Sequence, residues 1–506
     1  MGGGLIQLIA YGFDDMYLTY EPQITFFKVV YRRHTNFSTE QIPQYFINTP
    51  NFGKISTCII SRNADLVGNI NLVITLPKVR FADSNSKLLF AWVKRIGFSL
   101  IKKIELEING NVIDTHYGEW LSIWSELTGE INGEHSKSIN TMIGNVPNMT
   151  NFTNSKDEYL LYIPLQFWFC RGAGLTLPIV ALQNSDVKIN VEFEDPDKCY
   201  MLGPSHYIQC NDSIVNFIPF EYIEQNINGT INAGIFINFD IPTKRLYYYK
   251  VSAGKLLSTV DDIPYPIIGK TSQYITYGNI KSTSLTYPSP PIRNLNFVQC
   301  FLLVDYYFLD DDERMRFAQS KHDYLIEQLY YTPNINLNSG SANTQIIVEH
   351  PCKLMAWVTQ MNYIQNAKDY YNYTNSYQHK ILEDTSYPNV NVGDPINKSL
   401  ITSETILLNG NERLSLRNSL YFDKIQKYQY TRFETLTGIN MYSFAAFPFM
   451  TQPSGSFNAS QIDNIQIQLK LSSIISPTNQ ATFRCYCLCL NVLRIVNGLA
   501  ALVFTR

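Results

Sequence analysis

The sequence predicts an all-β protein built from two tandem copies of one β-domain, and three observations lead to this prediction. Most periodic segments are short and alternate apolar with polar residues, which is the pattern of half-buried strands. Asn-Gly pairs end two of these segments, at residues 109–110 and 409–410, and this pair is a strong hairpin signal. Three sequence landmarks also recur in the same order in the two halves of the chain.

Length and composition agree with two globular domains. The chain has 506 residues, whereas a single hydrophobic core usually stops growing near ~250 to 300 residues. The formal net charge of -3 provides no overall basic field, so we expect no direct binding of nucleic acid. No apolar run approaches the ~18 residues of a membrane-spanning helix, and the start lacks the basic segment of a signal peptide. We therefore expect a soluble, intracellular chain.

The clearest strands form one hairpin and two single segments. In KKIELEINGNVIDTH, Ile104, Leu106 and Ile108 share one face, and the chain then turns at Asn109-Gly110. Residues 187–193 and 465–471 repeat the alternation. These segments predict strands that bury one face in a core.

One stretch, DDDERMRFAQSKHDYL, predicts a helix. Its adjacent carboxylates Asp310, Asp311 and Asp312 would lie at the N-terminus, where free N–H groups favour acidic side chains. A metal site or an acid–base pair is the alternative interpretation of these carboxylates.

The internal repeat defines both copies and an insertion. The paired landmarks are IELEINGN with TILLNGNERL, SDVKINVEF with IDNIQIQLKL, and CFLLVDYYFLD with YCLCLNVLRIV. The last two landmarks lie far apart in the first copy and close together in the second. The first copy therefore carries an insertion near residues 199–295. We expect long loops with short strands there, projecting from one end of the domain.

Nine widely scattered cysteines do not form a disulfide framework, and they favour a reducing compartment. Cys485, Cys487 and Cys489 alternate along one segment, so they would share one face of a strand. We interpret them as small core residues, with a metal site as the alternative.

An aromatic group surrounds His116 in DTHYGEW, together with Tyr117, Trp120 and Trp124. Such a group could bind a sugar. Packing at a strand end or a short helix is the simpler interpretation, because Trp and Tyr supply apolar bulk with one polar atom each.

The chain resembles the major capsid proteins of nucleocytoplasmic large DNA viruses along its whole length. The similarity begins with GGGLIQLIAYGFDDMYLTYEPQITFFKVVYRRHTNFS, although Tyr20-Glu21 stands where the family usually has Gly-Asn. It continues through DTHYGEWLSIWSELT, LYIPLQFWFCRGAGLTLPIVALQNSDVKINVEF and LLVDYYFLDDDERMRFAQSKHDYLIEQL, and it ends with GINMYSFAAFPFMTQPSGSFNASQID and LNVLRIVNGLAALVF. Blocks in the family's order are more specific than any short motif.

The resemblance implies two tandem eight-stranded antiparallel jelly rolls with few short helices and long loops. It divides the chain into an N-terminal arm (1–24), a first jelly roll (25–310), a linker helix (311–323) and a second jelly roll (324–506). Ile24, Phe26 and Val29 or Val30 would lie in the first strand and pack between the two sheets.

The implied function is structural. Homotrimers would form pseudo-hexagonal capsomers that tile an icosahedral shell, because six similar wedges from three chains approximate a six-fold outline. The expected partners are neighbouring capsomers, minor capsid (cement) proteins and vertex proteins, with an inner membrane nearby. The expected location is the virion capsid, after assembly in the host cytoplasm. No catalytic site, cofactor or metal is expected.

Arg32, Arg33 and His34 follow the apolar run and form a candidate interface. They would leave the core where the strand emerges and become available to neighbouring chains or to the particle interior. An arginine fork can hold a carboxylate at a fixed angle, which suits such contacts. The alternative is that both arginines pair within their own chain.

Asn-x-Ser/Thr triplets are frequent in this Asn-rich chain, and most are expected to carry no sugar. The loops that hold four of them are the candidate glycosylation sites: Asn148, Asn151, Asn228 and Asn372.

A carbohydrate-binding or hydrolytic jelly-roll protein is the competing hypothesis, because fold does not determine function. A glycosidase needs two carboxylates ~5 to 10 Å apart across a cleft, and no spacing in the sequence singles out such a pair. The sequence also contains no P-loop, His-Glu-x-x-His, paired CxxC or G-x-S-x-G motif.

Overall fold

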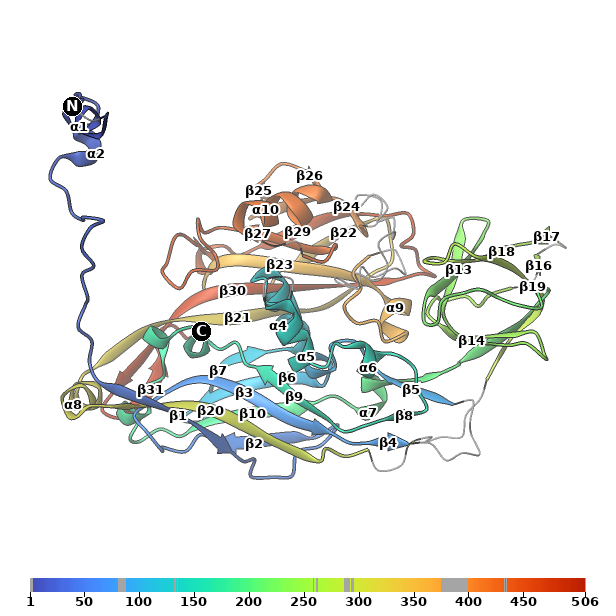
Figure 1. Ribbon diagram of the computed structural model, residues 1–506, viewed down its shortest axis with the longest axis horizontal. Helices are drawn as coiled ribbons and strands as arrows, with labels where there is room; N and C mark the ends of the chain where they lie inside the picture. The colour runs from blue at the N-terminus through green and yellow to red at the C-terminus, as the bar shows by residue number, and fades with distance from the viewer. Residues whose placement is uncertain are drawn as a thin grey trace.

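The protein consists mainly of long antiparallel strands that run along the longest axis of the molecule (Figure 1). The computed structural model describes residues 3–505 except 81–87, 132, 134, 258, 261–262, 286–291, 293–294, 375–398, 432 and 434. Two jelly rolls lie side by side, which confirms the predicted fold class. We call them roll 1 and roll 2.

Roll 1 is a sandwich of two four-stranded sheets, in the orders β1-β20-β3-β9 and β2-β10-β6-β7. Its strands are β1 (Phe37–Gln44), β2 (Ile55–Ile59), β3 (Leu66–Leu76), β6 (Ile101–Ile108), β7 (Asn111–His116), β9 (Tyr159–Pro164), β10 (Val187–Phe193) and β20 (Gln299–Leu309).

Roll 2 repeats this topology strand for strand, with the orders β21-β30-β23-β27 and β22-β29-β24-β25. Its strands are β21 (His322–Leu337), β22 (Ser341–Gln345), β23 (Pro351–Met361), β24 (Ile401–Leu408), β25 (Asn411–Glu412), β27 (Ile439–Ser443), β29 (Ile465–Leu471) and β30 (Ala481–Val496). The three landmark pairs fall on equivalent strands: β6 with β24, β10 with β29, and β20 with β30. The repeat in the sequence is therefore a repeat of structure.

The two Asn-Gly turns adopt the same conformation. Asn109 and Gly110 have φ values of 52° and 79°, and Asn409 and Gly410 have φ values of 49° and 79°. Positive φ at both central residues is the geometry that closes a two-residue hairpin with the right-handed twist of its strands. The predicted hairpin of β6 and β7 is confirmed, with Ile104, Leu106 and Ile108 buried.

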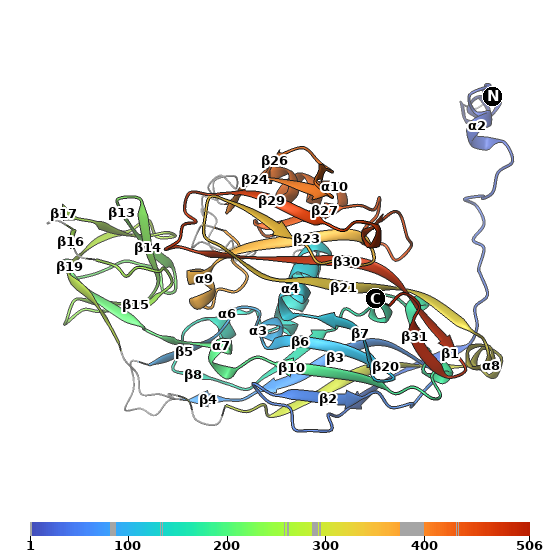
Figure 2. The same ribbon diagram turned by 180° about the vertical axis from the view of Figure 1, so that it is seen from behind.

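The insertion in roll 1 contains strands, as expected, but these strands close into a barrel instead of lying among long loops. Six strands close on themselves in the order β12-β15-β14-β13-β18-β19, around a core of their own that includes Ile208, Phe236 and Tyr248. The barrel projects from one end of the molecule, opposite the N-terminal arm (Figure 2). Its strands are β12 (His206–Cys210), β13 (Tyr222–Ile227), β14 (Thr230–Asp240), β15 (Arg245–Lys250), β18 (Pro266–Gly269) and β19 (Ile275–Ser284).

The N-terminal arm is longer than predicted, because the first strand begins at Phe37. Ile24, Phe26, Val29 and Val30 are 70 to 89% exposed, so their placement in a strand between the sheets is wrong. An apolar run becomes a buried strand only where a sheet edge accepts it. The position beside β20 is taken by β1, where Ile42 pairs with Val304. The arm holds the short helices α1 (Gly3–Ile9) and α2 (Met16–Thr19).

The predicted helix after residue 310 is α8 (Asp311–Gln319), which connects the two rolls. The Asp310 carboxylate accepts a hydrogen bond from the Glu313 N–H at 2.9 Å, so Asp310 is the N-cap. Arg314 ties the helix to roll 1 through an ion pair with Asp65 at 3.0 Å. The helix N-terminus interpretation of the acidic cluster is confirmed.

The core of roll 2 contains the cysteine row of β30. Cys485, Cys487 and Cys489 are fully buried free thiols that pack with Trp357 and Ile467, which confirms their prediction as core residues. Among the described residues, no helix is both long enough and apolar enough to cross a membrane.

The remaining elements are short. The helices are α3 (Ile96–Ser99), α4 (Gly118–Leu127), α5 (Ser136–Met142), α6 (Pro147–Thr150), α7 (Pro196–Cys199), η2 (Trp168–Cys170), η3 (Ala173–Leu175), η4 (Ile179–Ala181), α9 (Asn362–Asn366), η6 (Tyr421–Ile425), α10 (Gln426–Tyr430) and η7 (Ala459–Gln461). The strands are β4 (Val79–Arg80), β5 (Leu89–Trp92), β8 (Ser155–Lys156), β11 (Tyr200–Gly203), β16 (Thr259–Val260), β17 (Ile263–Pro264), β26 (Arg417–Asn418), β28 (Phe457–Asn458) and β31 (Leu499–Leu502).

Candidate assembly surfaces and the cavity between the rolls

Helix α4 joins the two rolls. Its apolar residues recur at helical spacing, and Leu121 enters the core of roll 1. The opposite face packs on the β21-β30-β23-β27 sheet of roll 2 and contributes Trp120, Ile123, Trp124 and Leu127 to a shared core. That sheet supplies most of the rest of this core: Leu329, Leu354, Ala356, Val358, Ile439, Met441, Tyr486 and Leu488. Tyr373, from the segment after α9, completes it.

The start of α4 fits closely against roll 1. A Cβ atom on Gly118 would lie 2.1 Å from the carbonyl oxygen of Phe98, so only glycine allows this approach. Glu119 follows directly and is thereby held at the boundary between the rolls.

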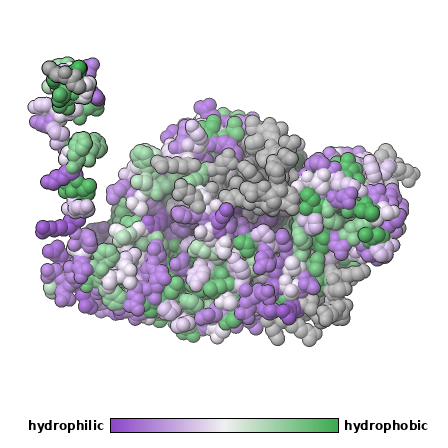
Figure 3. All heavy atoms as spheres, viewed as in Figure 1, coloured by the Kyte–Doolittle hydropathy of each residue, from purple (hydrophilic) through white to green (hydrophobic). Residues whose placement is uncertain are grey.

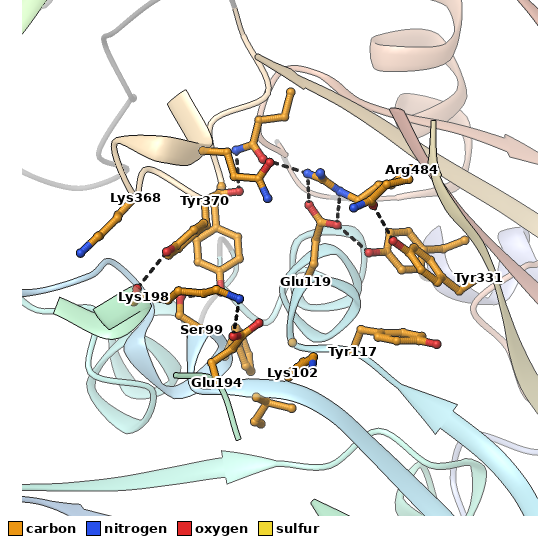
Figure 4. A pocket seen from close by; sticks show the side chains of 18 of the residues that line it. Ser99, Lys102, Tyr117, Glu119, Glu194, Lys198, Tyr331, Lys368, Tyr370 and Arg484 are labelled. Carbon is orange, nitrogen blue, oxygen red and sulfur yellow. Dashed lines mark hydrogen bonds and ion pairs between the residues drawn. The ribbon is translucent and has the colours of Figure 1, made fainter. Parts of the chain in front are cut away.

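Glu119 is the centre of a polar network across this boundary (Figure 4). Arg484 of β30 donates two hydrogen bonds to its carboxylate, at 2.6 and 2.7 Å. The hydroxyl of Tyr486 donates a third at 2.6 Å, and that of Tyr373 a fourth at 3.0 Å. Burial, and then the charge of Glu119, raises the pKa of Tyr486 well above its usual value. Both hydroxyls therefore remain protonated and act as donors.

A second buried network crosses the boundary at Glu327 of β21. Its carboxylate is shared by Arg171 of roll 1 and Lys353 of β23. The guanidinium of Arg171 also lies over the Trp124 ring, 4.1 Å from its centroid. Burial lowers the pKa of Lys353, and the carboxylate of Glu327 opposes this shift. The two rolls are thus joined by paired charges as well as by apolar contacts.

A cavity of about 560 Å³ lies beside the Glu119 network, between the rolls. Tyrosines contribute much of its lining: Tyr117, Tyr331, Tyr370, Tyr371 and Tyr486. Two ion pairs line it, since Arg484 binds Glu119 and Lys198 lies 2.8 Å from Glu194. Lys368 donates hydrogen bonds to the backbone carbonyls of Asp197 and Tyr200. The carboxylate of Glu119 is saturated by donors rather than free to act as an acid or a base. The cavity is therefore best described as part of the boundary between the rolls.

The aromatic group around His116 packs in the interior, as the packing interpretation predicted. The imidazole is buried and stacks on Phe167, with ring centroids 4.7 Å apart. Trp120 and Trp124 are covered by roll 2, so neither indole offers a free face to a sugar.

The candidate interface residues Arg32, Arg33 and His34 lie on the exposed arm, away from the sheets. The imidazole Nδ1 of His34 lies 2.7 Å from the carbonyl oxygen of Thr35. Within the described part of the chain, no ion pair involves Arg32 or Arg33, so the intrachain alternative finds no support here. Their role at an interface remains a prediction.

The arm also exposes many large apolar side chains besides the four that were predicted to lie in a core. Phe26, Phe27 and Tyr31 are at least 88% exposed. Apolar and polar residues alternate along the arm where it stands clear of the body (Figure 3). A large exposed apolar surface of this kind is typical of an interaction site. The sequence signal was present as a hydrophobic run, but the run does not pack in either sheet of roll 1.

The candidate glycosylation sites separate by exposure. Asn148 of α6 and Asn228 in the β13–β14 turn are exposed, and Asn151 is half-buried. Asn372 is only 1% exposed, and its side-chain oxygen accepts hydrogen bonds from the backbone N–H and the hydroxyl of Thr374. The prediction of Asn372 as a glycosylation site is therefore corrected, because this side chain does not lie on the surface of the folded chain. The other three remain predictions.

Comparison with known families accounts for most of the chain. Residues 25–231 match the family described as the major capsid protein N-terminus, and residues 313–501 match the large eukaryotic DNA virus major capsid protein. The chain belongs to this major capsid protein family. The first match covers most of roll 1 of the capsid protein, and the second covers roll 2. Much of the barrel lies between the two matches.

Relatives match the capsid protein over its full length. Probable capsid protein 4 of Acanthamoeba polyphaga mimivirus is 38% identical, over 100% of this chain and 99% of that protein. The major capsid protein of Phaeocystis pouchetii virus is 31% identical, over 100% of both chains. The quasi-atomic model of the PBCV-1 virus capsid is similar in structure, with a TM-score of 0.63, 26% identity, and coverage of 95% of this chain and 100% of that one.

These similarities define the class of the protein. It is a major capsid protein of a large DNA virus, located in the virion capsid, and a structural protein rather than an enzyme. A protein of this class has neighbouring capsid subunits as partners.

Proposed function

We propose that the capsid protein forms homotrimers, and that these trimers are pseudo-hexagonal capsomers that tile the icosahedral shell. The observation that carries the proposal is the head-to-tail arrangement of two equivalent rolls within one chain. Helix α4 and strand β7 of roll 1 meet the β21-β30-β23-β27 sheet of roll 2. A heterologous contact of this kind extends to further copies and closes into a ring when its rotation permits.

The long axis of the chain would stand perpendicular to the capsid facet, because rolls that lie side by side in a ring share their strand direction. One end then faces the interior and the other faces outward. The arm and α8 lie at one end and the barrel at the other (Figures 1 and 2). We assign the arm to the interior of the particle, where cement proteins, vertex proteins and an inner membrane would be its neighbours. Assembly would take place in the host cytoplasm.

Negative-stain imaging of the purified chain, expressed without other viral proteins, tests the capsomer. We expect particles with a hexagonal outline. Compact single chains without this outline, at concentrations up to the micromolar range, would contradict the proposal.

The arm carries the second part of the proposal, which is contact with neighbours through Arg32 and Arg33. Substituting both by Ala should leave the thermal unfolding of the body unchanged, because both side chains are exposed. The same substitutions should reduce incorporation into particles when the variant competes with the wild-type chain during infection. The control is Lys54→Ala with Lys137→Ala, which removes the same charge from exposed positions on roll 1. Equal incorporation of the two variants would refute the role of the arginines.

A further inference from the structure

Four thiols meet in the core of roll 2. Cys352 of β23 joins the cysteine row of β30, Cys485, Cys487 and Cys489, and all four side chains are fully buried in the same core. We propose that Cys352 and Cys489 form a disulfide when the particle leaves the reducing host cytoplasm, and that this bond links two neighbouring strands of the β21-β30-β23-β27 sheet. Disulfides persist at virion surfaces and in other oxidising surroundings, whereas the cytosol keeps thiols reduced.

A β-bulge turns Cys352 toward the cysteine row. The pairing of β23 with β30 is regular from Leu354 onward, and its register shifts by one residue between Cys352 and Leu354. In an unbroken ladder Cys352 would lie opposite Leu490, with its thiol on the face of the sheet that carries Leu354. With the bulge, Cys352 lies opposite Cys489 and its thiol enters the core of roll 2.

The position opposite Cys489 is the one that suits a disulfide. Residues directly opposite in an antiparallel pair have Cα atoms about 4.5 to 5.5 Å apart, which lies within the span of about 4.4 to 6.8 Å of a disulfide. The sulfur atoms of Cys485 and Cys487 are 3.9 Å apart. Two residues along one strand, however, separate their Cα atoms by about 6.5 to 7 Å, at or beyond this limit. Cys487 lies opposite Met355, so a bond from Cys487 to Cys352 would run diagonally across the strands.

Cys352 is the attacking thiol. Burial acts to raise its pKa, but hydrogen bonds from the thiols of Cys487 and Cys489 outweigh burial, so the pKa of Cys352 is lowered. Its thiolate attacks one sulfur of a low-molecular-weight disulfide such as oxidised glutathione and releases one glutathione. The Cys489 thiolate then attacks the Cys352 sulfur of the mixed disulfide and releases the second glutathione. The two protein thiols thereby lose two protons and two electrons, and the oxidant gains them.

The position of Cys352 in its strand provides a route for the oxidant. Cys352 is the second residue of β23, and strand ends open locally more often than strand centres. Its neighbour on the side away from β30 is β28, a strand of two residues in which Phe457 lies opposite Cys352. Opening of this strand end exposes the thiol without unfolding the roll.

The disulfide would fix the sheet that joins the two rolls. Lys353, next to Cys352, shares the carboxylate of Glu327 with Arg171 of roll 1. The bond also closes the long segment between β23 and β30, which contains β24, β27 and β29, and a closed loop restricts the unfolded chain. The oxidised chain should therefore melt several degrees higher than the reduced chain. The inference rests on the proposed assembly in the host cytoplasm and not on the trimer.

The recombinant full-length chain tests the pairing. The chain is reduced and then incubated with oxidised glutathione and a metal chelator, both in buffer and in urea just below the unfolding transition. Free thiols are blocked with N-ethylmaleimide before digestion. Mass spectrometry should find the Cys352 peptide linked to the Cys489 peptide, and the melting temperature should rise by several degrees and fall again with dithiothreitol. Cys489→Ala should lose both effects. Cys485→Ala is the matched control, because it removes a buried thiol of the same row and should keep both.

Three results would overturn the pairing, whatever the oligomeric state of the chain. They are cysteines that are all blocked by N-ethylmaleimide in both solutions, a bond from Cys352 to Cys487 in place of Cys489, and a link that leaves the melting temperature unchanged. A monomeric wild-type chain would refute the proposed trimer and leave the disulfide standing.

Infected cells test when the bond forms. Chains taken from the host cytoplasm into N-ethylmaleimide should carry both thiols free, and particles collected from the medium in the same way should carry the link. Particles with both thiols free would refute the disulfide in the virion. Cytoplasmic chains that are already linked would refute oxidation upon release.

Discussion

At the scale of single residues, buried polar groups were the feature that the sequence revealed least. The match of TILLNGNERL with IELEINGN indicated a strand at β24, yet Glu404 within this strand is fully buried in the core of roll 2. One carboxyl oxygen accepts a hydrogen bond from the Trp357 indole at 2.8 Å, and the other has no hydrogen-bond partner among the described residues. Sequence spacing cannot identify such a group, because Trp357 lies far away in the chain.

Glu404 should make the stability of the protein depend on pH. Burial, and to a lesser extent the charge of Asp423, raises the pKa of Glu404 from 4.5 to about 8. The folded state therefore holds a proton that the unfolded state releases between these values, so stability should fall as the pH rises from about 4.5 to 8. Glu404→Gln should remove this slope and gain roughly 1 to 3 kcal/mol at pH 8.

Melting temperatures of both proteins, measured between pH 5 and pH 8.5, check this prediction. We expect the two curves to diverge steadily as the pH rises. Curves that stay parallel across this range would show that Glu404 is not a neutral buried acid.

The Glu119 network should be costly to break. Glu119→Gln leaves the buried side chain of Arg484 without its counter-charge and should destabilise the chain by about 2 to 4 kcal/mol. Asp323→Asn is the matched control, because it breaks the exposed ion pair with Arg494 and should have no measurable effect. Chemical denaturation of both variants makes the comparison, and equal midpoints would contradict the structural role of Glu119.

At the scale of elements, the sequence predicted what depends on local pattern and missed what depends on a distant partner. The hairpin, the strands at 187–193 and 465–471, and the helix after Asp310 follow from alternation, turn residues and capping. The arm and the barrel do not. Ile24, Phe26 and Val30 have the composition of a strand, but β1 occupies the sheet edge. The barrel's closure depends on pairing between β12 and β19, far apart in the chain.

The two Asn-Gly turns give a paired test of the repeat. Gly110→Ala and Gly410→Ala should each cost about 1 kcal/mol, because both glycines have φ of +79° and a Cβ atom would meet open space at either position. Gly340→Ala is the control: it also faces open space but lacks the positive φ, so it should be nearly neutral. Unequal costs at the two turns, measured by denaturant titration, would show that the copies differ there.

At the scale of the whole molecule, the two copies and their tandem order were evident from the landmarks, whereas the contact between them was not. Both indoles in GEWLSIW were interpreted as packing residues, but the sequence does not say that they pack on the other roll. That fact determines the architecture, because the contact through α4 makes the two rolls one body.

Trp124→Ala should therefore weaken the coupling between the rolls. The indole contacts Trp120, Phe449 and the Arg171 guanidinium, and its removal should cost about 3 to 5 kcal/mol. Calorimetry should show the unfolding transition separating into two. The control is Trp92→Ala, because the indole of Trp92 packs on Phe52 and Phe90 of roll 1. This variant should lower the melting temperature but keep a single transition. A single cooperative transition in Trp124→Ala would contradict the coupling role.

The solution mass of the purified full-length chain tests the central claim most directly. Sedimentation equilibrium across a range of concentrations should give three times the 58.1 kDa mass of one chain, because a head-to-tail ring of six equivalent rolls needs three chains. A folded chain that remains monomeric, or that stops at a dimer, would contradict the account, since two or four rolls cannot complete a ring of six.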